Sequence, residues 1–405
     1  MLVGLDDTDS PGGMCTTYIG VVLAGRLKEY HIPVHEARLL RLNPNVIYKT
    51  RGNAAVCLDV TGDREKIFRT ACEVVEKYAC FDHDNTNPGV VVADSPPSPR
   101  FYRQAVQGFC TIDEAKDVLE EAGALYRGYK NERGLIGATA AVCSEIPDRT
   151  YEFLTYRKPE AFGTPRNVSR ESLFLAERET CPHTWDSVDT TNDVVVCVPH
   201  TPDPVLFGIR GESPSWVSKA RGLVVSEPTG FEQVFVTNQG TDSHLLDASE
   251  VALADGFSYR LQGTVSSVAR TGKGGHVCIG IGTDTGAEVD CMAFEPTKGF
   301  RNIVRALLPG DVVEVTGSFK NGSLNIEKIH ICSLSGAGTT KPPVCGACGK
   351  RMTSAGREKG YKCRQCGARA REPEVIPIKR ELKTGWYEVP PIARRHLAKP
   401  LCRGP

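Results

Sequence analysis

Four cysteines in the last quarter of the chain constrain the fold more than any other feature. Cys345 and Cys348 form one Cys-x2-Cys pair, Cys363 and Cys366 form a second, and fourteen residues separate the two pairs. Each pair predicts a short knuckle, and two facing knuckles place four thiolates in a tetrahedron around zinc. Because all four ligands are protein thiolates, we expect a structural zinc with no open position. Two redox Cys-x-x-Cys sites are the alternative, but the βαβ surroundings typical of such sites are missing.

The other twelve of the 16 cysteines are scattered through apolar stretches such as 55–58. The N-terminus has no basic region and meets carboxylates almost at once, which predicts no signal peptide and a reducing compartment. We therefore expect these twelve to be free core thiols. No apolar run approaches the roughly 18 residues of a membrane span, so we expect no membrane-spanning segment and no membrane partner.

The formal net charge of zero averages two unlike parts. Residues 341–405 contain 16 Lys+Arg against 5 Asp+Glu, whereas residues 1–340 contain 33 basic and 44 acidic residues. A basic end on an acidic body predicts a polyanionic partner, nucleic acid first, although a merely solvated basic tail is the alternative.

Strand and helix patterns alternate over roughly the first 240 residues. The expected strands are 1–5, 38–42, 54–60 and 90–94, and the expected helices are 16–30, 63–78, 111–122 and one that 134–138 lead into. This interleaving predicts an α/β or α+β fold and does not determine the strand order.

From about Ser258 the pattern becomes one of alternating strands. We expect strands at 259–269, 276–282, 288–294, 311–319 and 323–331, with a helix at 297–308. Five strands with a helix between the third and the fourth follow the order of an OB-fold, a barrel that often binds oligonucleotides and sometimes only mediates packing. A linker rich in Gly, Ser, Thr and Pro, residues 333–343, then leads to the cysteine segment.

Three carboxylates follow the first strand within four residues. Asp6, Asp7 and Asp9 offer the hard oxygen ligands that suit Mg²⁺ beside a nucleotide phosphate. Gly12 and Gly13 allow the backbone to approach a ligand closely. Simple helix capping is the alternative, but three crowded carboxylates repel one another unless a cation compensates them.

Candidate phosphate-binding groups follow in three places. Thr16 opens the first helix, so it caps that helix, ligates a metal or accepts a phosphoryl group. Lys49 and Arg51 stand in a polar loop, where cations clamp nucleotide phosphates or are simply solvated. The glycine pair of 133–137 is a weaker second approach of backbone to phosphate. The chain contains no Gly-x4-Gly-Lys-[Ser/Thr] P-loop.

Polar residues also cluster in three strings, 181–187, 199–211 and 237–244. Such strings can bind a polar ligand, and Asp203 or Asp242 can hold a cationic one. They can equally be networks of Asx turns, and their spacing does not decide between the two.

Long strings of this chain resemble those of the archaeal tRNA(Ile)-agmatinylcytidine synthetases, the agmatidine synthetase family. The matching strings are 4–10, 13–18, 41–44, 48–53, 203–212, 237–242, 386–391 and 393–397. The resemblance spans the whole chain, including the expected OB-fold and zinc ribbon.

The resemblance implies an archaeal ATP-dependent ligase that attaches agmatine to C2 of the wobble cytidine of an isoleucine tRNA, through phosphoryl activation of the C2 oxygen, so that the tRNA reads AUA. It implies a multidomain α+β fold, with a kinase-like α/β domain followed by a ferredoxin-like domain, an OB-fold β-barrel and a zinc ribbon. We expect their bounds at 1–140, 141–255, 256–335 and 340–372, with a basic tail at 373–405, and the first two domains can be interleaved. The expected cofactors are ATP, Mg²⁺ and structural Zn²⁺, and the expected state is a monomer.

The same reading assigns roles to single residues. The resemblance ties Thr16 to phosphoryl transfer, whether or not it carries phosphate covalently, and the chemistry needs a carboxylate for the agmatine guanidinium, Asp203 or Asp242. The remaining expected substrate contacts are Arg210, Asn238, Arg394 and Arg395, and the last two grip the tRNA backbone with His396 and Lys399. The target base must leave the anticodon loop to be reached.

Two readings from other classes remain at this point. One is a non-catalytic protein that binds tRNA or other nucleic acid through the OB-fold and the zinc ribbon, and the other is a metal-dependent nuclease that uses the Asp cluster. Magnesium-dependent ATP turnover separates the ligase from both.

Overall fold

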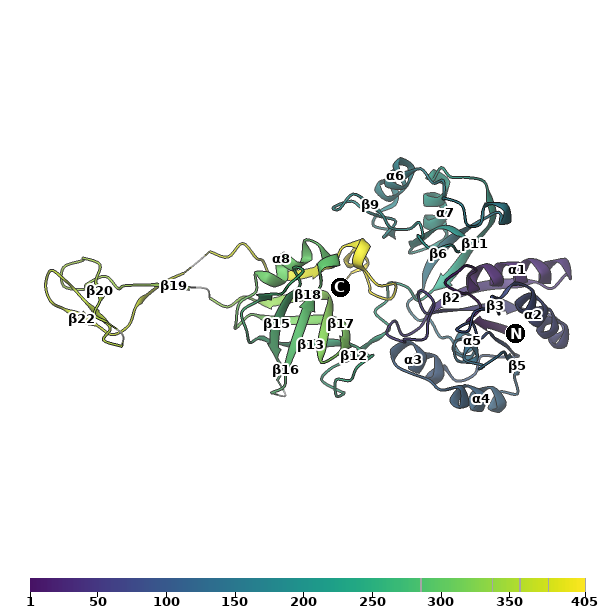
Figure 1. Cartoon of the computed structure of the whole chain (residues 1–405), viewed down its shortest axis with the longest axis horizontal. Coiled ribbons are helices and arrows are strands. Elements are labelled where there is room, and N and C mark those ends of the chain that lie inside the picture. Colours follow the sequence, from purple (N-terminus) through teal and green to yellow (C-terminus); the bar gives the residue numbers. More distant parts are fainter. Residues whose placement is uncertain (285, 337, 357, 378, 405) are drawn as a thin grey trace.

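The computed structural model describes residues 1–284, 286–336, 338–356, 358–377 and 379–404. The molecule is elongated, with a mixed sheet at one end, a barrel in the middle and a small cysteine-bearing lobe at the other end (Figure 1). The C-terminus lies between the barrel and the sheet. Over the described ranges, no helix has the length and apolarity needed to cross a membrane.

A nine-stranded sheet forms the first half of the protein. Its strand order is β5-β4-β1-β3-β2-β11-β6-β10-β7, and every neighbouring pair is antiparallel except β2 with β11. The strands are β1 (Leu2–Asp6), β2 (Val34–Arg41), β3 (Ala54–Val60), β4 (Gly89–Ala93), β5 (Leu125–Gly128), β6 (Thr150–Arg157), β7 (Thr184–Trp185), β10 (Val205–Gly211) and β11 (Thr229–Thr237). The parallel β2–β11 pair joins chain segments almost 200 residues apart, so it unites two halves of the sheet.

Helices cover both faces of the β5–β2 half because its strands alternate. Val3 and Leu5 of β1 pack toward α1 (Thr16–Glu29) and α2 (Arg64–Tyr78), whereas Leu2 packs toward the opposite face. That opposite face carries α3 (Pro99–Gln107), α4 (Ile112–Glu121) and α5 (Gly134–Val142). The other half of the sheet packs on α6 (Arg170–Thr180) and α7 (Pro214–Leu223), and a short hairpin of β8 (Val188–Asp189) and β9 (Val194–Val195) lies beside it.

The middle of the chain forms a closed five-stranded barrel. Its strands are β13 (Ser258–Val265), β15 (Val277–Gly282), β16 (Glu288–Ala293), β17 (Val312–Lys320) and β18 (Ser323–Ser333), with α8 (Phe300–Arg305) between the third and the fourth. The pairings β13–β15, β15–β16, β16–β18, β18–β17 and β17–β13 close the ring, and only β16–β18 is parallel. This is the connectivity of an OB-fold, as the sequence predicted. Short strands β12 (Leu245–Asp247) and β14 (Arg270–Thr271) extend the barrel at its edges.

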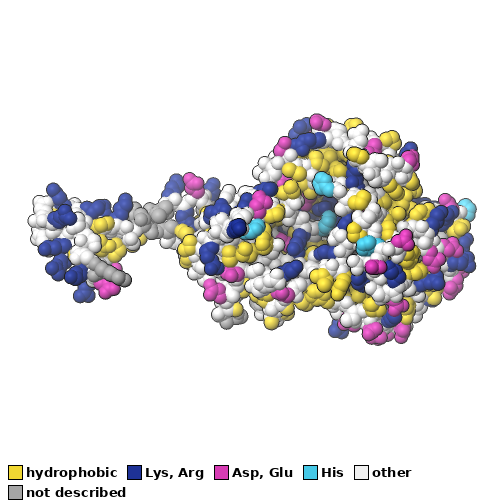
Figure 2. Space-filling view, viewed as in Figure 1, with side chains coloured by type: hydrophobic (Ala, Val, Ile, Leu, Met, Phe, Trp, Pro, Cys, Tyr) yellow, Lys and Arg dark blue, Asp and Glu magenta, His cyan; other side chains and the backbone are white. Residues whose placement is uncertain are grey.

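The cysteine-bearing lobe projects from the barrel on a two-stranded stalk. The stalk pairs β19 (Gly338–Lys341) with β23 (Glu374–Pro377), and the lobe holds β20 (Thr353–Ser354), β21 (Tyr361–Lys362) and β22 (Arg369–Ala370). We call the described residues between 338 and 377 the arm. Lys and Arg side chains gather around it in Figure 2, so the basic end of the sequence forms a basic projection.

After the arm the chain returns to the body. β24 (Gly385–Glu388) adds to the barrel beside β18, and the residues after it run back to the sheet. We call residues 385–404, β24 included, the C-terminal segment. The backbone N–H groups of Gly240 and Thr241 donate to the carbonyls of His396 and Leu397 over 2.8 and 3.1 Å. The predicted basic tail is therefore divided between an arm strand, a barrel strand and a segment packed on the sheet.

The expectation of twelve free core thiols is wrong for three of them. All twelve are free cysteines, but Cys181, Cys332 and Cys402 are exposed. Each stands at the end of a structural element: the C-cap of α6, the last residues of β18 and the final 3-10 turn (Leu401–Arg403). An apolar neighbourhood in sequence does not bury a residue where an element ends.

Candidate active site

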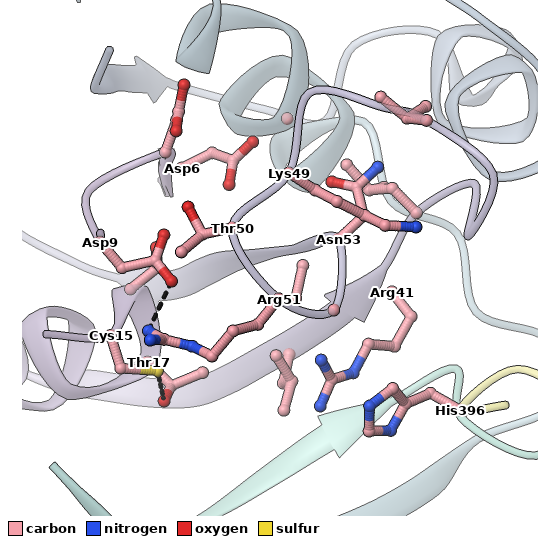
Figure 3. A pocket seen from close by; sticks show the side chains of 18 of the residues that line it. Asp6, Asp9, Cys15, Thr17, Arg41, Lys49, Thr50, Arg51, Asn53 and His396 are labelled. Atoms are coloured by element: carbon pink, nitrogen blue, oxygen red, sulfur yellow. Dashed lines mark hydrogen bonds and ion pairs between the residues drawn. The ribbon is translucent and has the colours of Figure 1, made fainter. Parts of the chain in front are cut away.

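A cavity of about 510 Å³ is lined by residues from both halves of the sheet. It brings together eight of the site residues predicted from sequence, and these are Asp6, Asp7, Asp9, Thr16, Lys49, Arg51, Asp203 and Arg210. Figure 3 shows Asp6 and Asp9 at one end of the pocket, Arg41 with His396 at the other, and Arg51 between them. The pocket thus has an acidic end and a basic floor.

The acidic end is the turn that follows β1. Asp7 pairs with Arg133 over 3.0 Å and Asp9 with Arg51 over 2.5 Å, whereas Asp6 has no ion pair among the described residues. Burial and the charges of Asp7 and Asp9 raise the pKa of Asp6 well above its ordinary value. A bound cation would offset this penalty, although among the described residues only the four clustered cysteines converge closely enough to hold a metal ion as they stand.

Helix α5 lies unusually close to this acidic turn. A Cβ on Gly137 would stand 1.8 Å from Oδ2 of Asp6, so only glycine allows the carboxylate its position. One turn earlier, a Cβ on Gly134 would stand 2.4 Å from the backbone nitrogen of Gly89 in β4. The weak glycine-pair signal of the sequence therefore reflects the contact of α5 with the sheet beside Asp6.

Thr16 is the first residue of α1 and lies at the edge of the pocket. Its hydroxyl is 2.9 Å from the hydroxyl of Thr8, and the residue is buried. The neighbouring Cys15 Sγ lies 3.0 Å from Oγ1 of Thr17. Burial and the nearby Asp203 and Asp9 raise the pKa of the Cys15 thiol, so Cys15 stays protonated and neutral.

The polar loop between β2 and β3 forms one wall of the pocket and its mouth. Arg51 donates to Asp9 and to the carbonyl of Ser10 at 3.2 Å, which aims its guanidinium at the acidic turn. Burial, with Arg395 and Lys320 nearby, lowers the pKa of Lys49. Like-charged groups therefore meet at the mouth, where an anion would relieve their repulsion.

A second wall is the loop that carries Asp203. The Asp203 carboxylate accepts the hydroxyl of Thr201 and the backbone N–H of Val205, the latter over 3.0 Å. Arg166 donates to the backbone carbonyls of Pro199, Thr201, Asp203 and Val205, each over 2.8 Å. This polar string is thus an internally bonded loop, as one of the two sequence interpretations has it, and its place in the pocket lining leaves ligand binding as a prediction.

The floor contains two charged groups that sequence reasoning missed, Arg41 and Glu152, and one residue that it placed elsewhere, His396. Glu152 of β6 lies 3.9 Å from the guanidinium of Arg41 and 3.7 Å from that of Arg210. His396 of the C-terminal segment completes the floor, and burial together with Arg41 and Arg210 lowers its pKa well below the ordinary value, so the imidazole is neutral. A glutamate between Tyr151 and Phe153 in the strand pattern of 150–157 was the available signal.

Several predicted residues lie outside the pocket lining and hold its surroundings in place. Asn238 donates to the carbonyl of Arg41 and accepts its N–H, at 2.9 and 2.8 Å, which fixes the backbone of a floor residue. Gly12 and Gly13 form the turn after the acidic cluster, and a Cβ on Gly13 would stand 3.2 Å from the carbonyl of Pro202. Close packing against the Asp203 loop is therefore one use of this glycine pair.

The remaining predicted contacts tie the C-terminal segment to the body. Asp242 binds Lys328 of the barrel and accepts the backbone N–H of Lys399 over 2.7 Å. Arg394 is 4% exposed and pairs with Asp186 and Glu388. Arg395 is 32% exposed and lies 3.4 Å from Glu327.

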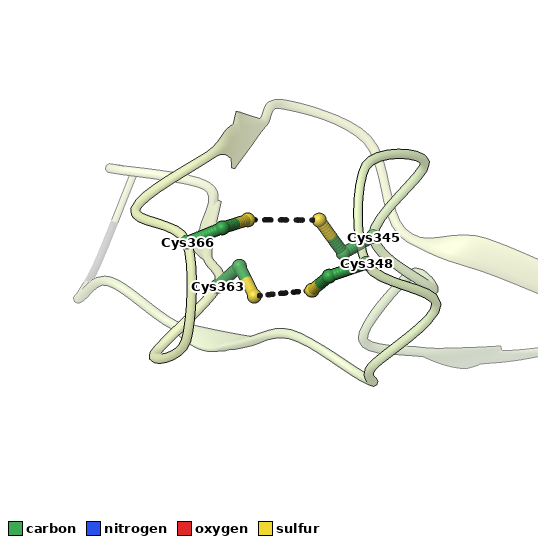
Figure 4. A group of neighbouring side chains, drawn as sticks. All are labelled: Cys345, Cys348, Cys363 and Cys366. Atoms are coloured by element: carbon green, nitrogen blue, oxygen red, sulfur yellow. Dashed lines mark hydrogen bonds between the residues drawn. The ribbon is translucent and has the colours of Figure 1, made fainter.

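The four clustered cysteines meet at the tip of the arm (Figure 4). Their Sγ atoms all lie within 4.8 Å of one another, and the pairs Cys345–Cys366 and Cys348–Cys363 are 3.4 Å apart. A tetrahedral zinc–thiolate site has edges of about 3.8 Å, so the four thiols fit zinc. Backbone N–H groups, that of Cys366 first, lower the pKa of Cys363 to about 6, which favours the thiolate.

Fold and pocket together define a multidomain α+β protein that joins a charged pocket on a mixed sheet to an OB barrel and a four-thiolate zinc ribbon. Three family models match this chain: the TiaS TCKD domain over residues 2–131, the TiaS FLD domain over 132–244 and the TiaS C-terminal zinc ribbon domain over 342–382. The chain belongs to the TiaS family. Helix α5 falls within the range of the second model, yet it packs on β1 and β4 of the first.

Curated relatives and solved structures agree with the family models. The isoleucine-tRNA 2-agmatinylcytidine synthetase TiaS of Methanocorpusculum labreanum is 54% identical over 100% of this chain and 97% of its own, and that of Methanosarcina mazei is 48% identical over the same shares. The crystal structure of TiaS in complex with its isoleucine tRNA and ATP superposes with a TM-score of 0.93 at 46% identity, covering 100% of this chain and 97% of the other. A TiaS complex with the same tRNA, AMPCPP and agmatine gives 0.91 at 44%, covering 99% and 96%.

Proposed function

We propose that this chain is an ATP-dependent ligase that attaches agmatine to C2 of the wobble cytidine of an isoleucine tRNA, forming agmatidine. The observation that carries the proposal is the pocket itself. It combines an acidic turn for a metal–nucleotide complex, cations for phosphate and a separate carboxylate wall. The relatives that bind isoleucine tRNA, ATP and agmatine support it, and they do not favour the non-catalytic alternative.

The acidic end would handle ATP. Asp6, Asp7 and Asp9 would hold Mg²⁺, which offsets phosphate charge, while Lys49 and Arg51 would contact phosphate oxygens. Thr16 stands at the N-terminus of α1 with its hydroxyl at the pocket edge, where it would contact or accept the phosphoryl group. We infer that this half of the sheet belongs to a kinase-like domain, and that the half that carries α6 and α7 belongs to a ferredoxin-like domain.

The chemistry explains why a nucleotide is needed. The C2 oxygen of cytosine is a poor leaving group, and transfer of a phosphoryl group from ATP to that oxygen makes it a better one. The primary amine of agmatine then attacks C2, the C2–O bond breaks, phosphate leaves with the bonding electrons and the amine loses a proton. The pocket's task is to hold the three reactants in line and to exclude water.

For the guanidinium end of agmatine we favour Asp203 over Asp242. Asp203 lines the pocket, where its carboxylate accepts from Thr201 and Val205 and already pairs with one guanidinium, that of Arg166, over 3.5 Å. Asp242 does not line the pocket, and it binds Lys328 and the backbone N–H of Lys399. An Asp203→Asn enzyme should therefore show a raised KM for agmatine with an unchanged KM for ATP.

The barrel and the arm would bind the tRNA. The arm exposes eight basic residues, which are Lys341, Lys350, Arg351, Lys359, Lys362, Arg364, Arg369 and Arg371. At the pocket mouth, Lys49 lies near Lys320 of the barrel and Arg395 of the C-terminal segment, a suitable entrance for an anticodon loop with its wobble base turned out. Arg394 and His396 are too buried to contact a tRNA backbone without rearrangement, which leaves Arg395 as the better candidate of that motif. We expect a cytoplasmic monomer.

One assay tests the proposal. Purified protein is incubated with Mg-ATP, radiolabelled agmatine and the unmodified isoleucine tRNA, with a variant tRNA carrying uridine at the wobble position as control. Label in the first tRNA alone supports the ligase. Salt-sensitive tRNA binding without any incorporation would instead support a non-catalytic binding protein.

A further inference from the structure

A row of alternating charges runs from the pocket floor to the strand that follows the arm. Successive groups are separated by 3.9 Å (Arg41 to Glu152), 3.7 Å (Glu152 to Arg210), 3.6 Å (Arg210 to Asp186) and 3.2 Å (Asp186 to Arg394), and the row ends in the ion pair of Arg394 with Glu388. Glu388 is the last residue of β24, so the row connects the pocket with the barrel.

The backbone explains how these groups come together. Arg210 of β10 stands opposite Glu152 of β6 on one side and opposite Trp185 of β7 on the other. Asp186 follows directly with a φ of 60°, a left-handed conformation that ends β7 and that aspartate tolerates better than most residues. The string 181–187, which had no role in the sequence analysis beyond its polarity, thus places a carboxylate beside Arg210.

The middle of the row is buried. The side chains of Glu152, Asp186 and Arg394 are 5%, 3% and 4% exposed, and that of Arg210 is 14% exposed. Burial raises the pKa of Asp186, and Arg394 and then Arg210 oppose that effect. A charge buried this deeply is held by its partners, so loss of one member leaves its neighbour uncompensated.

Arg210 differs from the other members in what it leaves unused. Arg210 is one of the residues that line the cavity, and its two ion pairs, at 3.7 and 3.6 Å, are longer than hydrogen bonds. Among the described residues its guanidinium donates no hydrogen bond, whereas Arg394 binds Glu388 tightly. An arginine of the cavity lining that is held by charge from two sides, and whose N–H groups make no hydrogen bond among the described residues, can bind an acceptor.

We propose that Arg210 donates to an oxygen acceptor of the substrates, and that Asp186 and Arg394 are positioning residues that orient Arg210 for this contact. The acceptor is a phosphoryl oxygen or a pyrimidine carbonyl oxygen. The inference rests on the proposed function for the identity of those substrates. It gives the motif 393–397 a task inside the enzyme, in place of a contact with the tRNA backbone.

A double-mutant cycle tests whether Asp186 and Arg394 act through Arg210. Arg210→Gln should lower kcat/KM for agmatine incorporation by about 100-fold, as loss of one preorganised donor typically does. Asp186→Asn and Arg394→Gln should each lower it by about tenfold. Because both act through Arg210, the double variant Asp186→Asn/Arg210→Gln should be no worse than Arg210→Gln alone. If kcat/KM of the double variant fell by the product of the two single losses, the proposal would be overturned.

Arg403→Gln is the matched control. Arg403 lies in the same C-terminal segment, is 6% exposed and pairs with Glu212 and Asp148. Its guanidinium lies over the ring of Trp185, but among the described residues it forms no ion pair with a member of the charge row. If Arg403→Gln lost as much activity as Arg394→Gln, loosening of the segment would explain both and the proposal would fail. Arg394→Lys, which keeps the charge but not the planar fork, should show an intermediate loss and covers the case in which Arg394→Gln unfolds.

Two further measurements identify the acceptor and separate this inference from the proposed function. A weaker Kd of Arg210→Gln for Mg-ATP without tRNA assigns a phosphoryl oxygen, whereas an unchanged Kd with slower incorporation assigns the pyrimidine carbonyl. An unchanged Kd together with unchanged incorporation refutes the contact. Wild-type incorporation of agmatine tests the proposed function by itself, and if it failed, the same cycle on tRNA-dependent ATP turnover would still test the row.

Discussion

The contact of Gly137 with Asp6 gives the sharpest test of the acidic end. In a Gly137→Ala variant the new methyl group would begin 1.8 Å from Oδ2 of Asp6, and real Cβ atoms essentially never come closer than 3.0 Å to another heavy atom. The carboxylate oxygen or the helix must therefore withdraw by more than an ångström. The helix cannot withdraw freely, because its backbone lies directly on β1 and β4 through Gly4, Gly89 and Gly134.

The expected magnitude follows from that displacement. Overpacking of this kind costs about 1–3 kcal/mol, and moving a catalytic group by about 1 Å costs about 100-fold in rate. We expect kcat/KM for agmatine incorporation to fall by about 100-fold and Mg-ATP binding to weaken. The melting temperature should fall by only a few degrees, since the strain is relieved at one side chain.

Gly25→Ala provides the control, because nothing lies within 4 Å of a Cβ at that position in α1. It should stabilise the helix by about 0.5–1 kcal/mol and leave activity unchanged. Steady-state incorporation, calorimetric titration with Mg-ATP and thermal unfolding of both variants complete the experiment. If the Gly137→Ala variant kept the activity and the ATP affinity of the wild type, the assignment of Asp6 to the metal–nucleotide site would be refuted.

Three other outcomes follow from the structure. Removing zinc with a chelator, or by Cys363→Ser, should release one zinc per chain by metal analysis and unfold the arm, while the Kd for Mg-ATP stays unchanged because the pocket lies in the sheet. Burial and Asp186 raise the pKa of Glu177 to about 7, so the folded state loses stability as the pH rises from about 4.5 through 7. At pH 8 the Glu177→Gln variant should therefore be more stable than the wild type, by up to about 3 kcal/mol in the free energy of unfolding measured in urea. Equal stability of the two proteins at pH 8 would contradict this. Replacing 338–377 with a short Gly-Ser linker should reduce the slope of log Kd against log salt for tRNA by about 0.7–0.9 for each phosphate that the arm neutralises, and an unchanged slope would exclude the arm from tRNA binding.

Local patterns in the sequence predict much of this architecture. Alternating residues from 259 onward predict five strands and a helix, and the barrel is built from them in that order. The spacing of the four cysteines predicts their cluster. Three crowded carboxylates after β1 predict a magnesium–nucleotide site, and all three line the pocket. In each case a few neighbouring residues carry the whole signal, so no knowledge of the strand order is needed.

What sequence reasoning missed depends on long-range pairing. Arg41, Glu152 and His396 meet only because β2 pairs with β11, β11 pairs with β6, and the C-terminal segment returns to the sheet. The same return buries Arg394, which as part of a basic string was expected to contact RNA. Charge composition cannot distinguish a solvated arginine from one paired with Asp186, because its partner is about 200 residues away in sequence.

The return of the C-terminal segment also determines when the enzyme becomes complete during its synthesis. A nascent chain that has left the ribosome as far as the arm already contains the acidic turn, the polar loop and the Asp203 wall. It lacks His396 and Arg394, so the floor of its pocket is open and Arg210 has no outer support. A message cut short after the zinc ribbon would therefore yield a protein that contains the sheet, the barrel strands β13 to β18 and the zinc ribbon but has an unfinished pocket. Such a product would be expected to bind ATP or tRNA without attaching agmatine to the tRNA.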